Sequence, residues 1–256
     1  MRSAWHETWH DTWRTARGIV RSLRIYYGTR GHHAAMERLY RRFVKAGDLV
    51  FDIGAHVGDR TTAFRRLEAR VVAVEPQPAL VRTLQLMFGR DPAVTIEPVA
   101  VGRAAGVIDL KLNLENPTVS TASDAFLRAA AGAPGWERQT WTKIVPVPVT
   151  TIDTLVARHG RPAFIKIDVE GFEAEALAGL SHPCPALSFE FTTIARDVCA
   201  ACVERCEALG YRRFNAVIGE RHALVHSDWV NAQAITAWLN ALPHDANSGD
   251  IYAQLP

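Results

Sequence analysis

The chain has 256 residues, of which 48% are hydrophobic and 22% charged, and its formal net charge is +2 at pH 7. This composition is ordinary for a globular protein with one large core, and it excludes a strongly basic surface for nucleic acid or for an anionic membrane. No apolar stretch approaches the ~20 residues that span a bilayer, and the N-terminus lacks the apolar segment of a signal peptide, so we expect a cytoplasmic protein.

The first 45 residues predict a helical extension rich in Trp, His and Arg. Trp5, Trp9 and Trp13 recur every four residues and therefore share one face of a helix. We favour packing of this face on the main domain. The alternatives are a lid over the substrate or a contact in a homodimer, because aromatic faces anchor interfaces.

The chain is organised around one glycine-containing turn. A short apolar run at 48–53 predicts a buried strand, and a helix follows at about 60–68. Gly54 and Gly58 let the turn approach a ligand without interference from a Cβ atom, and the free N–H groups of the helix point back at that ligand. The spacing D-x-G-x-x-x-G, which starts at Asp52, indicates a nucleotide site, although it is not the dinucleotide fingerprint G-x-G-x-x-G.

A second strand, at 71–75, ends in Glu75. An acid at this position, about 20 residues after the first turn, usually accepts the ribose hydroxyls of a nucleotide. The alternative is a turn without a ligand and a solvated Glu75. Pro78 opens a helix to about residue 88, and a strand at 94–99 completes a β-α-β-α-β unit. This unit predicts a parallel sheet with right-handed crossovers.

Residues 107–112 and 144–149 predict two more strands, and Pro146 and Pro148 allow the second to be an edge strand at best. The stretch between them, residues 113–143, predicts an irregular inserted loop. A loop of this length is usually functional or disordered. Its aromatic and hydroxyl side chains suit contact with a substrate, and a mobile surface loop is the alternative.

The rest of the chain completes the predicted sheet. A strand at 163–168 ends in a dense group of polar residues. The remaining predicted elements are a helix at 173–180, a strand at 186–191, a helix at 196–209, an antiparallel pair at 212–217 and 221–225, and a helix at 228–239 before a polar tail. The chain therefore divides into a helical extension (1–45), a main domain (46–226) with the inserted loop 113–143, and a C-terminal helix and tail (227–256).

Four acids lie at or near the carboxyl ends of predicted strands, where open parallel sheets bind ligands. They are Asp52, Glu75, Asp168 and Glu190. Lys166 alternates with Asp168 on its strand, so both side chains can point to the same face. A buried Lys166 needs a carboxylate partner, and Asp168 or Glu170 can serve.

Two other groups of residues are candidate metal ligands. His32 and His33 lie in a predicted loop, where a pair of histidines can bind a metal ion but exposed histidines are the default interpretation. The four cysteines are Cys184, Cys199, Cys202 and Cys206. The last three have helical spacing, and we favour buried thiols over a metal site, because no second ligand pair accompanies them.

Residues 165–173, I-K-I-D-V-E-G-F-E, resemble the hallmark of the FkbM family of S-adenosylmethionine-dependent methyltransferases. The F-D-I-G-A turn with its second glycine and Thr61, the V-E-P run at 74–76 and the segment V-T-T-I-D-T-L at 149–155 are also similar to family motifs. The resemblance implies an α/β fold with a Rossmann-like, seven-stranded class I methyltransferase sheet. This sheet is mostly parallel, with an antiparallel closing strand and helices on both faces.

The resemblance also implies roles for individual residues. The turn that begins at Asp52 holds the methionine part of the cofactor, Glu75 accepts the ribose hydroxyls, and residues 99–101 lie along the adenine. Asp168 faces the methyl-transfer centre. The implied cofactor-binding residues are Asp52, Gly54, Ala55, His56, Gly58, Thr61, Glu75, Pro76, Ala100 and Val101.

The implied reaction is methyl transfer from S-adenosylmethionine, which we expect to reach a hydroxyl of a small molecule such as a sugar or a polyketide-like product. A hydroxyl acceptor needs a general base, for which Asp168 is the first candidate, with Glu190 or Glu170 as its partner and Lys166 beside them. The alternatives are Mg²⁺ held by Asp168 and Glu190, or a purely structural ion pair between Lys166 and Glu170.

Two functions of other classes compete with methyl transfer. An NAD-type oxidoreductase would share the fold and Glu75, but should show the G-x-G-x-x-G fingerprint. A non-catalytic nucleotide-binding module would keep the turn without activity. Nucleic acid is not an expected partner of a nearly neutral chain, and no membrane partner is expected.

Overall fold

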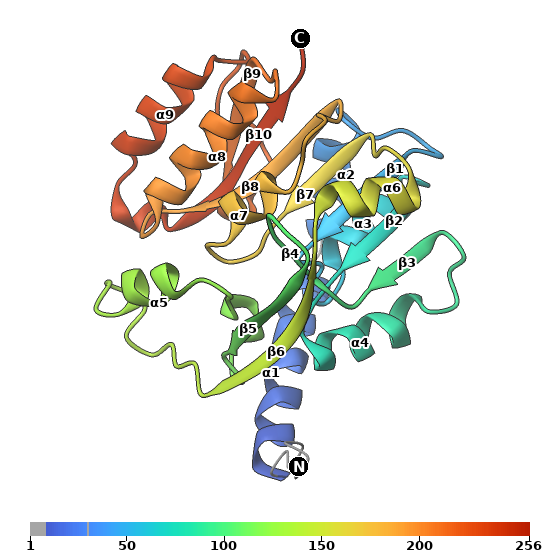
Figure 1. The fold of residues 1–256 in the computed structure, drawn as a ribbon. Helices are drawn as coiled ribbons and strands as arrows, with labels where there is room; N and C mark the ends of the chain where they lie inside the picture. The colour runs from blue at the N-terminus through green and yellow to red at the C-terminus, as the bar shows by residue number, and fades with distance from the viewer. Residues whose placement is uncertain (1–8, 30) are drawn as a thin grey trace.

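The protein is described as a computed structural model, which covers residues 9–29 and 31–256. Seven strands form one sheet in the order β3-β2-β1-β7-β8-β10-β9 (Figure 1). They are β1 (Leu49–Ile53), β2 (Arg70–Val74), β3 (Val94–Glu97), β7 (Phe164–Ile167), β8 (Ala186–Thr192), β9 (Arg213–Ile218) and β10 (Ser248–Gln254). β10 is antiparallel to both of its neighbours, whereas the pairs from β3 to β8 are parallel. The expected mostly parallel α/β sheet is confirmed.

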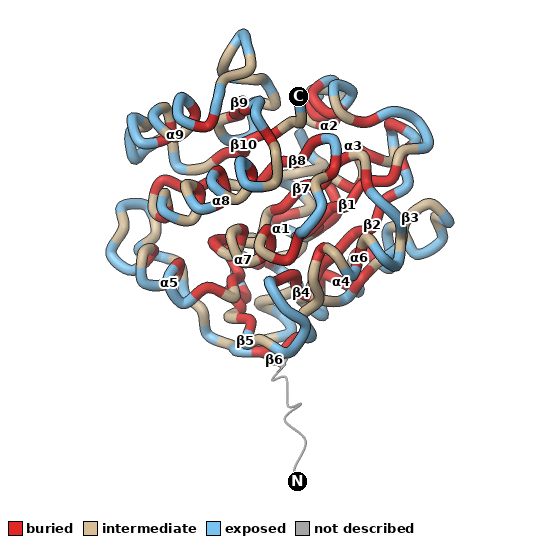
Figure 2. The backbone as a smooth tube through the Cα atoms, turned by 45° about the horizontal axis from the view of Figure 1, so that its top comes forward, coloured by how far each residue is buried: buried red, intermediate tan, exposed pale blue. Residues whose placement is uncertain are grey.

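Helices cover both faces of this sheet, so its central strands are buried on both sides (Figure 2). One face carries α2 (His32–Tyr40), α3 (Asp59–Arg66) and α4 (Pro78–Phe88), and the other carries α6 (Ile152–His159), α7 (Glu173–Ala178), α8 (Arg196–Ala208) and α9 (Ala232–Ala241). In β1, Phe51 and Ile53 pack beneath the second group and Val50 beneath the first. All five residues of β1 are therefore buried, as in other doubly covered parallel sheets.

A second, three-stranded sheet has the order β4-β6-β5, from β4 (Ala100–Val101), β5 (Gly106–Leu112) and β6 (Lys143–Thr150). β6 is its middle strand, so the expectation of an edge strand at best is wrong. β4 pairs only with Val149 and Thr150, beyond both prolines of β6. Pro146 and Pro148 thus lie where β5 is the one neighbouring strand, and the missing N–H groups can face away from it.

The insertion between these strands is not irregular throughout. It contains a 3-10 turn, η1 (Pro117–Val119), and a short helix, α5 (Asp124–Ala130). Ser123 caps α5 by accepting a hydrogen bond from Phe126 N at 3.0 Å. Such a cap is a local signal that the sequence contains. Thr121 Oγ1 donates to Glu170 O at 2.6 Å and thereby fastens the insertion to the turn after β7.

The predicted polar tail is wrong, because its last residues form β10 inside the main sheet. Residues 221–225, expected as the partner strand of β9, lie outside the strands. β10 begins with Ser-Gly-Asp, and this polar start conceals the apolar run Ile251–Ala253 that follows. Asp250 is buried in the sheet because it has a buried cationic partner, which the sequence does not reveal.

We predict that Gly249→Ala strongly destabilises the protein. A Cβ atom at this position would lie 2.1 Å from Val217 O and 2.9 Å from Phe191 Cε1, so β10 would have to move away from β9. We expect the free energy of unfolding, measured by urea denaturation, to fall by more than ~2 kcal/mol. The control is Gly106→Ala at the exposed start of β5, where an added Cβ meets nothing within 4 Å. Equal stability of the two variants would contradict the prediction.

The N-terminal helix α1 (Trp9–Gly28) packs on the molecule through small residues rather than through Trp13. Gly18 and Ser22 are buried, and a Cβ atom at Gly18 would lie 2.7 Å from the carbonyl oxygen of Leu114 in the insertion. Trp13 is 62% exposed. The expected packing of the tryptophan face is therefore wrong for Trp13, and Trp5 lies outside the described residues.

The four cysteines are buried as free thiols, which confirms the favoured interpretation. Cys199, Cys202 and Cys206 face the core from α8. Burial raises the pKa of each of these thiols, and it raises that of Cys184 to about 11. Inert thiols of this kind serve packing rather than chemistry.

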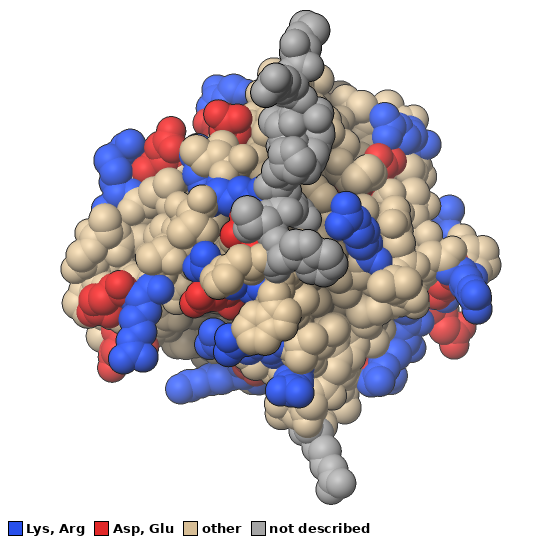
Figure 3. Space-filling view, turned by 90° about the horizontal axis from the view of Figure 1, so that it is seen from below, with Lys and Arg blue, Asp and Glu red and all other residues tan. Residues whose placement is uncertain are grey.

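None of the helices within residues 9–29 and 31–256 combines the length and the hydropathy needed to cross a membrane. On the face drawn in Figure 3, Lys and Arg side chains are spread over the surface, with acidic side chains beside some of them.

Candidate active site

One large pocket lies at the carboxyl ends of the parallel strands. Ten residues of the predicted site line it: Asp52, Gly54, His56, Glu75, Pro76, Ala100, Val101, Asp168, Glu170 and Glu190. The other four predicted residues, Ala55, Gly58, Thr61 and Lys166, are not part of this lining. The pocket also takes residues that sequence reasoning missed: Tyr26 of α1, Gln77, Phe172 and, from β10, Asp250.

The two glycines of the turn after β1 are needed by the protein's own packing. Both have a positive φ, +84° at Gly54 and +79° at Gly58. A Cβ atom on Gly54 would lie 1.7 Å from Asp168 O, and one on Gly58 would lie 2.4 Å from Phe88 Cε2. Gly54 thus brings the ends of β1 and β7 together, which places the turn and Asp168 in one pocket.

Asp52 supports the turn from inside the sheet. Its Oδ2 accepts a hydrogen bond from Thr61 Oγ1 at 2.5 Å, and both side chains are buried. Burial raises the pKa of Asp52 to about 6, and the bond from Thr61 opposes this shift. The pair ties the end of β1 to the first turn of α3.

Glu75 is held ready as an acceptor by two backbone N–H groups. His56 N donates to Oε2 at 2.9 Å, and Gln77 N donates to Oε1 at 2.8 Å. Glu75 is only 2% exposed, and burial raises its pKa to about 7. Each carboxylate oxygen has two lone pairs, so each can accept one further hydrogen bond. This is the arrangement that a pair of ribose hydroxyls requires.

Lys166 is fully buried and holds two carboxylates at the floor of the pocket. Its Nζ donates to Asp250 Oδ1 at 2.5 Å and to Asp168 Oδ2 at 3.1 Å. Asp168 is thus one partner, as expected, and among the described residues the second is Asp250 rather than Glu170. The two carboxylates hold the pKa of Lys166 well above its usual range, against the effect of burial.

Three carboxyl groups meet beside this lysine. Asp168, Glu170 and Glu190 each have an oxygen within 4.8 Å of the others. Burial, with the neighbouring acids, raises the pKa values of Glu170 and Glu190 well above their usual range. Glu190 Oε2 is buried without a hydrogen-bond partner among the described residues. The group can therefore take a proton or hold a hard cation with oxygen ligands.

Glu173 shapes the turn that carries Glu170. Its Oε1 accepts N–H bonds from Val169 at 3.0 Å and from Gly171 at 3.2 Å. Burial raises the pKa of Glu173 to about 7. Glu170 has a φ of +54°, a conformation that such local bonds must stabilise.

The family model described as "Methyltransferase FkbM domain" matches residues 52–239, which include the glycine turn, Glu75 and the carboxyl group cluster. The chain belongs to the FkbM methyltransferase family. It is accordingly a methyltransferase with S-adenosylmethionine as its cofactor. The residues present fit this cofactor, since Glu75 offers two free lone pairs beside a glycine turn at the start of α3. No curated protein sequence matches the chain.

The solved structures to which this FkbM-family chain is similar have low sequence identity to it. A TehB-like SAM-dependent methyltransferase from Corynebacterium glutamicum is 13% identical, with 96% of this chain and 98% of that chain covered and a TM-score of 0.47. Precorrin-6y C5,15-methyltransferase from Geobacter metallireducens is 15% identical, with 88% of this chain and 87% of that chain covered and a TM-score of 0.39. A SAM-dependent O-methyltransferase from Thermotoga maritima is 11% identical, with 87% of this chain and 64% of that chain covered and a TM-score of 0.41. The family match, and not these likenesses, identifies the chain.

Proposed function

We propose that this FkbM-family methyltransferase methylates a hydroxyl group of a small molecule. The observation that carries the proposal is the cluster of Asp168, Glu170 and Glu190 in the same pocket as Glu75. A hydroxyl is a weak nucleophile until its proton is removed, so a carboxylate beside the cofactor site supplies what the reaction needs.

The proposed roles follow from the contacts of each side chain. When bound, S-adenosylmethionine supplies a methyl group that its sulfonium already activates. Glu75 holds the ribose, and Asp168 takes the proton of the acceptor hydroxyl. Lys166 fixes Asp168 through its 3.1 Å contact, so the base is aligned before the acceptor arrives. Glu190, whose Oε2 has no hydrogen-bond partner among the described residues, can relay the proton or accept a hydrogen bond from a second hydroxyl of the acceptor.

The apolar walls of the pocket support an acceptor that is a small molecule with apolar surface. Leu110, Val119, Trp136 and Phe172 line it, and Val119 and Trp136 belong to the insertion. Apolar walls around a few polar groups are typical of small-molecule sites. They favour a polyketide-like hydroxyl over a bare sugar.

Mg²⁺ at the three carboxylates is the second candidate, because their oxygens lie within 4.8 Å of one another. A bound Mg²⁺ would acidify the hydroxyl in place of a protein base. Addition of Mg²⁺ to EDTA-treated protein separates the two: the activity should not depend on Mg²⁺ if Asp168 is the base, and Mg²⁺ but not Zn²⁺ should restore it if the magnesium ion is required.

A screen with methyl-¹³C-labelled S-adenosylmethionine tests the proposed function. Acceptors with hydroxyl, amine and activated carbon groups on the same apolar frameworks are offered in parallel, with and without EDTA. We expect products with the ¹³C shift of an O-methyl group from hydroxyl compounds alone. N-methyl or C-methyl products formed in preference would overturn the O-methylation proposal while leaving methyl transfer intact.

A further inference from the structure

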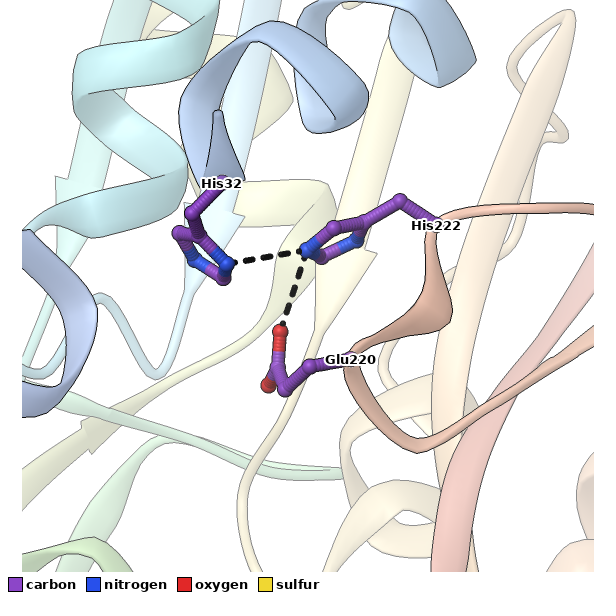
Figure 4. Close-up of side chains that lie close together, drawn as sticks. All are labelled: His32, Glu220 and His222. Carbon is purple, nitrogen blue, oxygen red and sulfur yellow. Dashed lines mark hydrogen bonds and ion pairs between the residues drawn. The ribbon is translucent and has the colours of Figure 1, made fainter. Parts of the chain in front are cut away.

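A second group of titratable side chains lies at the rim of the pocket, outside the carboxylate cluster. His32 begins α2, and Glu220 and His222 belong to the turn η2 (Gly219–Arg221) and the residue after it. His32 and His222 are 190 residues apart in the sequence, yet the three side chains point toward one another (Figure 4). The sequence predicted a loop at His32, but the structure places this residue at the start of a helix.

The distances between their ligand atoms suit one metal ion. His222 Nε2 lies 3.3 Å from His32 Nδ1 and 3.3 Å from Glu220 Oε2, and one ligand atom of each residue lies within 4.8 Å of those of the other two. Two ligands that each lie about 2.0–2.1 Å from a tetrahedral ion are about 3.3–3.4 Å apart. The group can thus close on an ion with little movement of the side chains.

The surroundings of His32 provide a second, independent observation. Its side chain is only 8% exposed, and Nε2, the ring nitrogen that faces away from His222, is buried without a hydrogen-bond partner among the described residues. This nitrogen lies 3.8 Å from Asp59 Oδ2. A histidine that binds a metal commonly directs its other ring N–H to a carboxylate, which fixes the free lone pair toward the ion.

We propose that His32, His222 and Glu220 bind one transition-metal dication of the zinc type. Two imidazoles and one carboxylate favour such an ion over Mg²⁺ or Ca²⁺, which prefer oxygen ligands. The ion joins α2 to the turn after β9. Since Gly219 and Glu220 line the pocket, it fastens part of the pocket's rim.

The neighbouring charges are compatible with an added cation. Arg60 Nη2 lies 3.0 and 3.1 Å from the two oxygens of Glu220, and Arg60 Nη1 lies 2.5 Å from Asp59. A carboxylate has about four lone-pair positions, so Glu220 can contact Arg60 and an ion together.

The alternative is a plain hydrogen bond between the two imidazoles, and metal titration separates the two. The test uses the full chain without a histidine tag, stripped with EDTA and dialysed. Zn²⁺ is titrated by calorimetry, and Co²⁺ is added to record the visible absorption of a four-coordinate site. We expect one Zn²⁺ per chain, the intense Co²⁺ bands, and a rise in melting temperature on Zn²⁺ addition.

His222→Asn is the decisive variant, because Asn tolerates the φ of +50° at this position. We expect its Zn²⁺ affinity to fall at least about tenfold and the Co²⁺ bands to disappear. His182→Ala, at an exposed histidine, and Glu190→Gln, in the carboxylate cluster, should bind Zn²⁺ as the wild type does. Failure of the wild type to bind Zn²⁺, or full binding by His222→Asn, would overturn the proposal.

Discussion

Glu75→Ala is expected to bind S-adenosylhomocysteine about 100-fold or more weakly than the wild type. A hydrogen bond to a charged group contributes roughly 1.5–3 kcal/mol, and the substitution removes two, which corresponds to a factor of about 100 or more. Calorimetric titration measures the loss. Glu175→Ala serves as the control, because Glu175 pairs with Arg103 on the surface. NAD, titrated in parallel, should not bind.

The pH dependence of binding separates a lost acceptor from a damaged turn. Burial raises the pKa of Glu75 to about 7 in the free protein, so the charged acceptor form is complete only above that pH. Affinity of the wild type for S-adenosylhomocysteine should therefore fall as the pH drops through 7. Glu75→Gln, which keeps an oxygen for one of the two backbone N–H groups, should show weaker binding without this pH step. An unchanged step in Glu75→Gln would show that another group titrates.

Asp168→Asn is expected to lower kcat at least about 100-fold while S-adenosylhomocysteine still binds, since a positioned general base typically contributes 10²–10⁴-fold. Asn retains an oxygen for Lys166, and Asp250 remains at 2.5 Å as the second partner of this lysine. The variant should therefore fold normally. Single-turnover methylation of an acceptor found in the ¹³C screen measures the rate.

Asp250→Asn is the matched control for this prediction. This variant also removes one of the two carboxylates that contact Lys166, but it leaves the proposed base intact. Asp250 lies on β10, opposite Glu190. If the loss in Asp168→Asn came only from the altered charge around Lys166, both variants would lose activity equally. We expect Asp250→Asn to retain much more activity. If Asp168→Asn keeps activity within tenfold of the wild type, Asp168 is excluded as the base, and Glu190 remains as the candidate.

Local patterns in the sequence were enough to predict the parallel half of the fold. The apolar run before Gly54, the acid after β2 and the proline at the start of α4 each depend on neighbours along the chain. The motifs around Asp52, Glu75 and Asp168 also led to ten site residues that the structure brings together in the pocket, because parallel strands bring their carboxyl ends to one edge.

What the sequence could not predict depends on partners that are distant along the chain. β10 has a weak strand pattern, and its place between β8 and β9 depends on Asp250 reaching Lys166, 84 residues away. Gly54 suggested close approach to a ligand, whereas it is the carbonyl of Asp168 that leaves no room for a Cβ. His32 has no partner near it in sequence. A homodimer, a cytoplasmic location and the role of α1 as a lid stay predictions.

A crystal structure with S-adenosylhomocysteine would test the proposed site most directly. We predict both ribose hydroxyls at hydrogen-bond distance from Glu75, about 2.6–3.2 Å, and the sulfur turned toward Asp168 and Glu190. A ribose bound away from Glu75, or a sulfur facing away from the carboxylate cluster, would contradict the assignment of both sites.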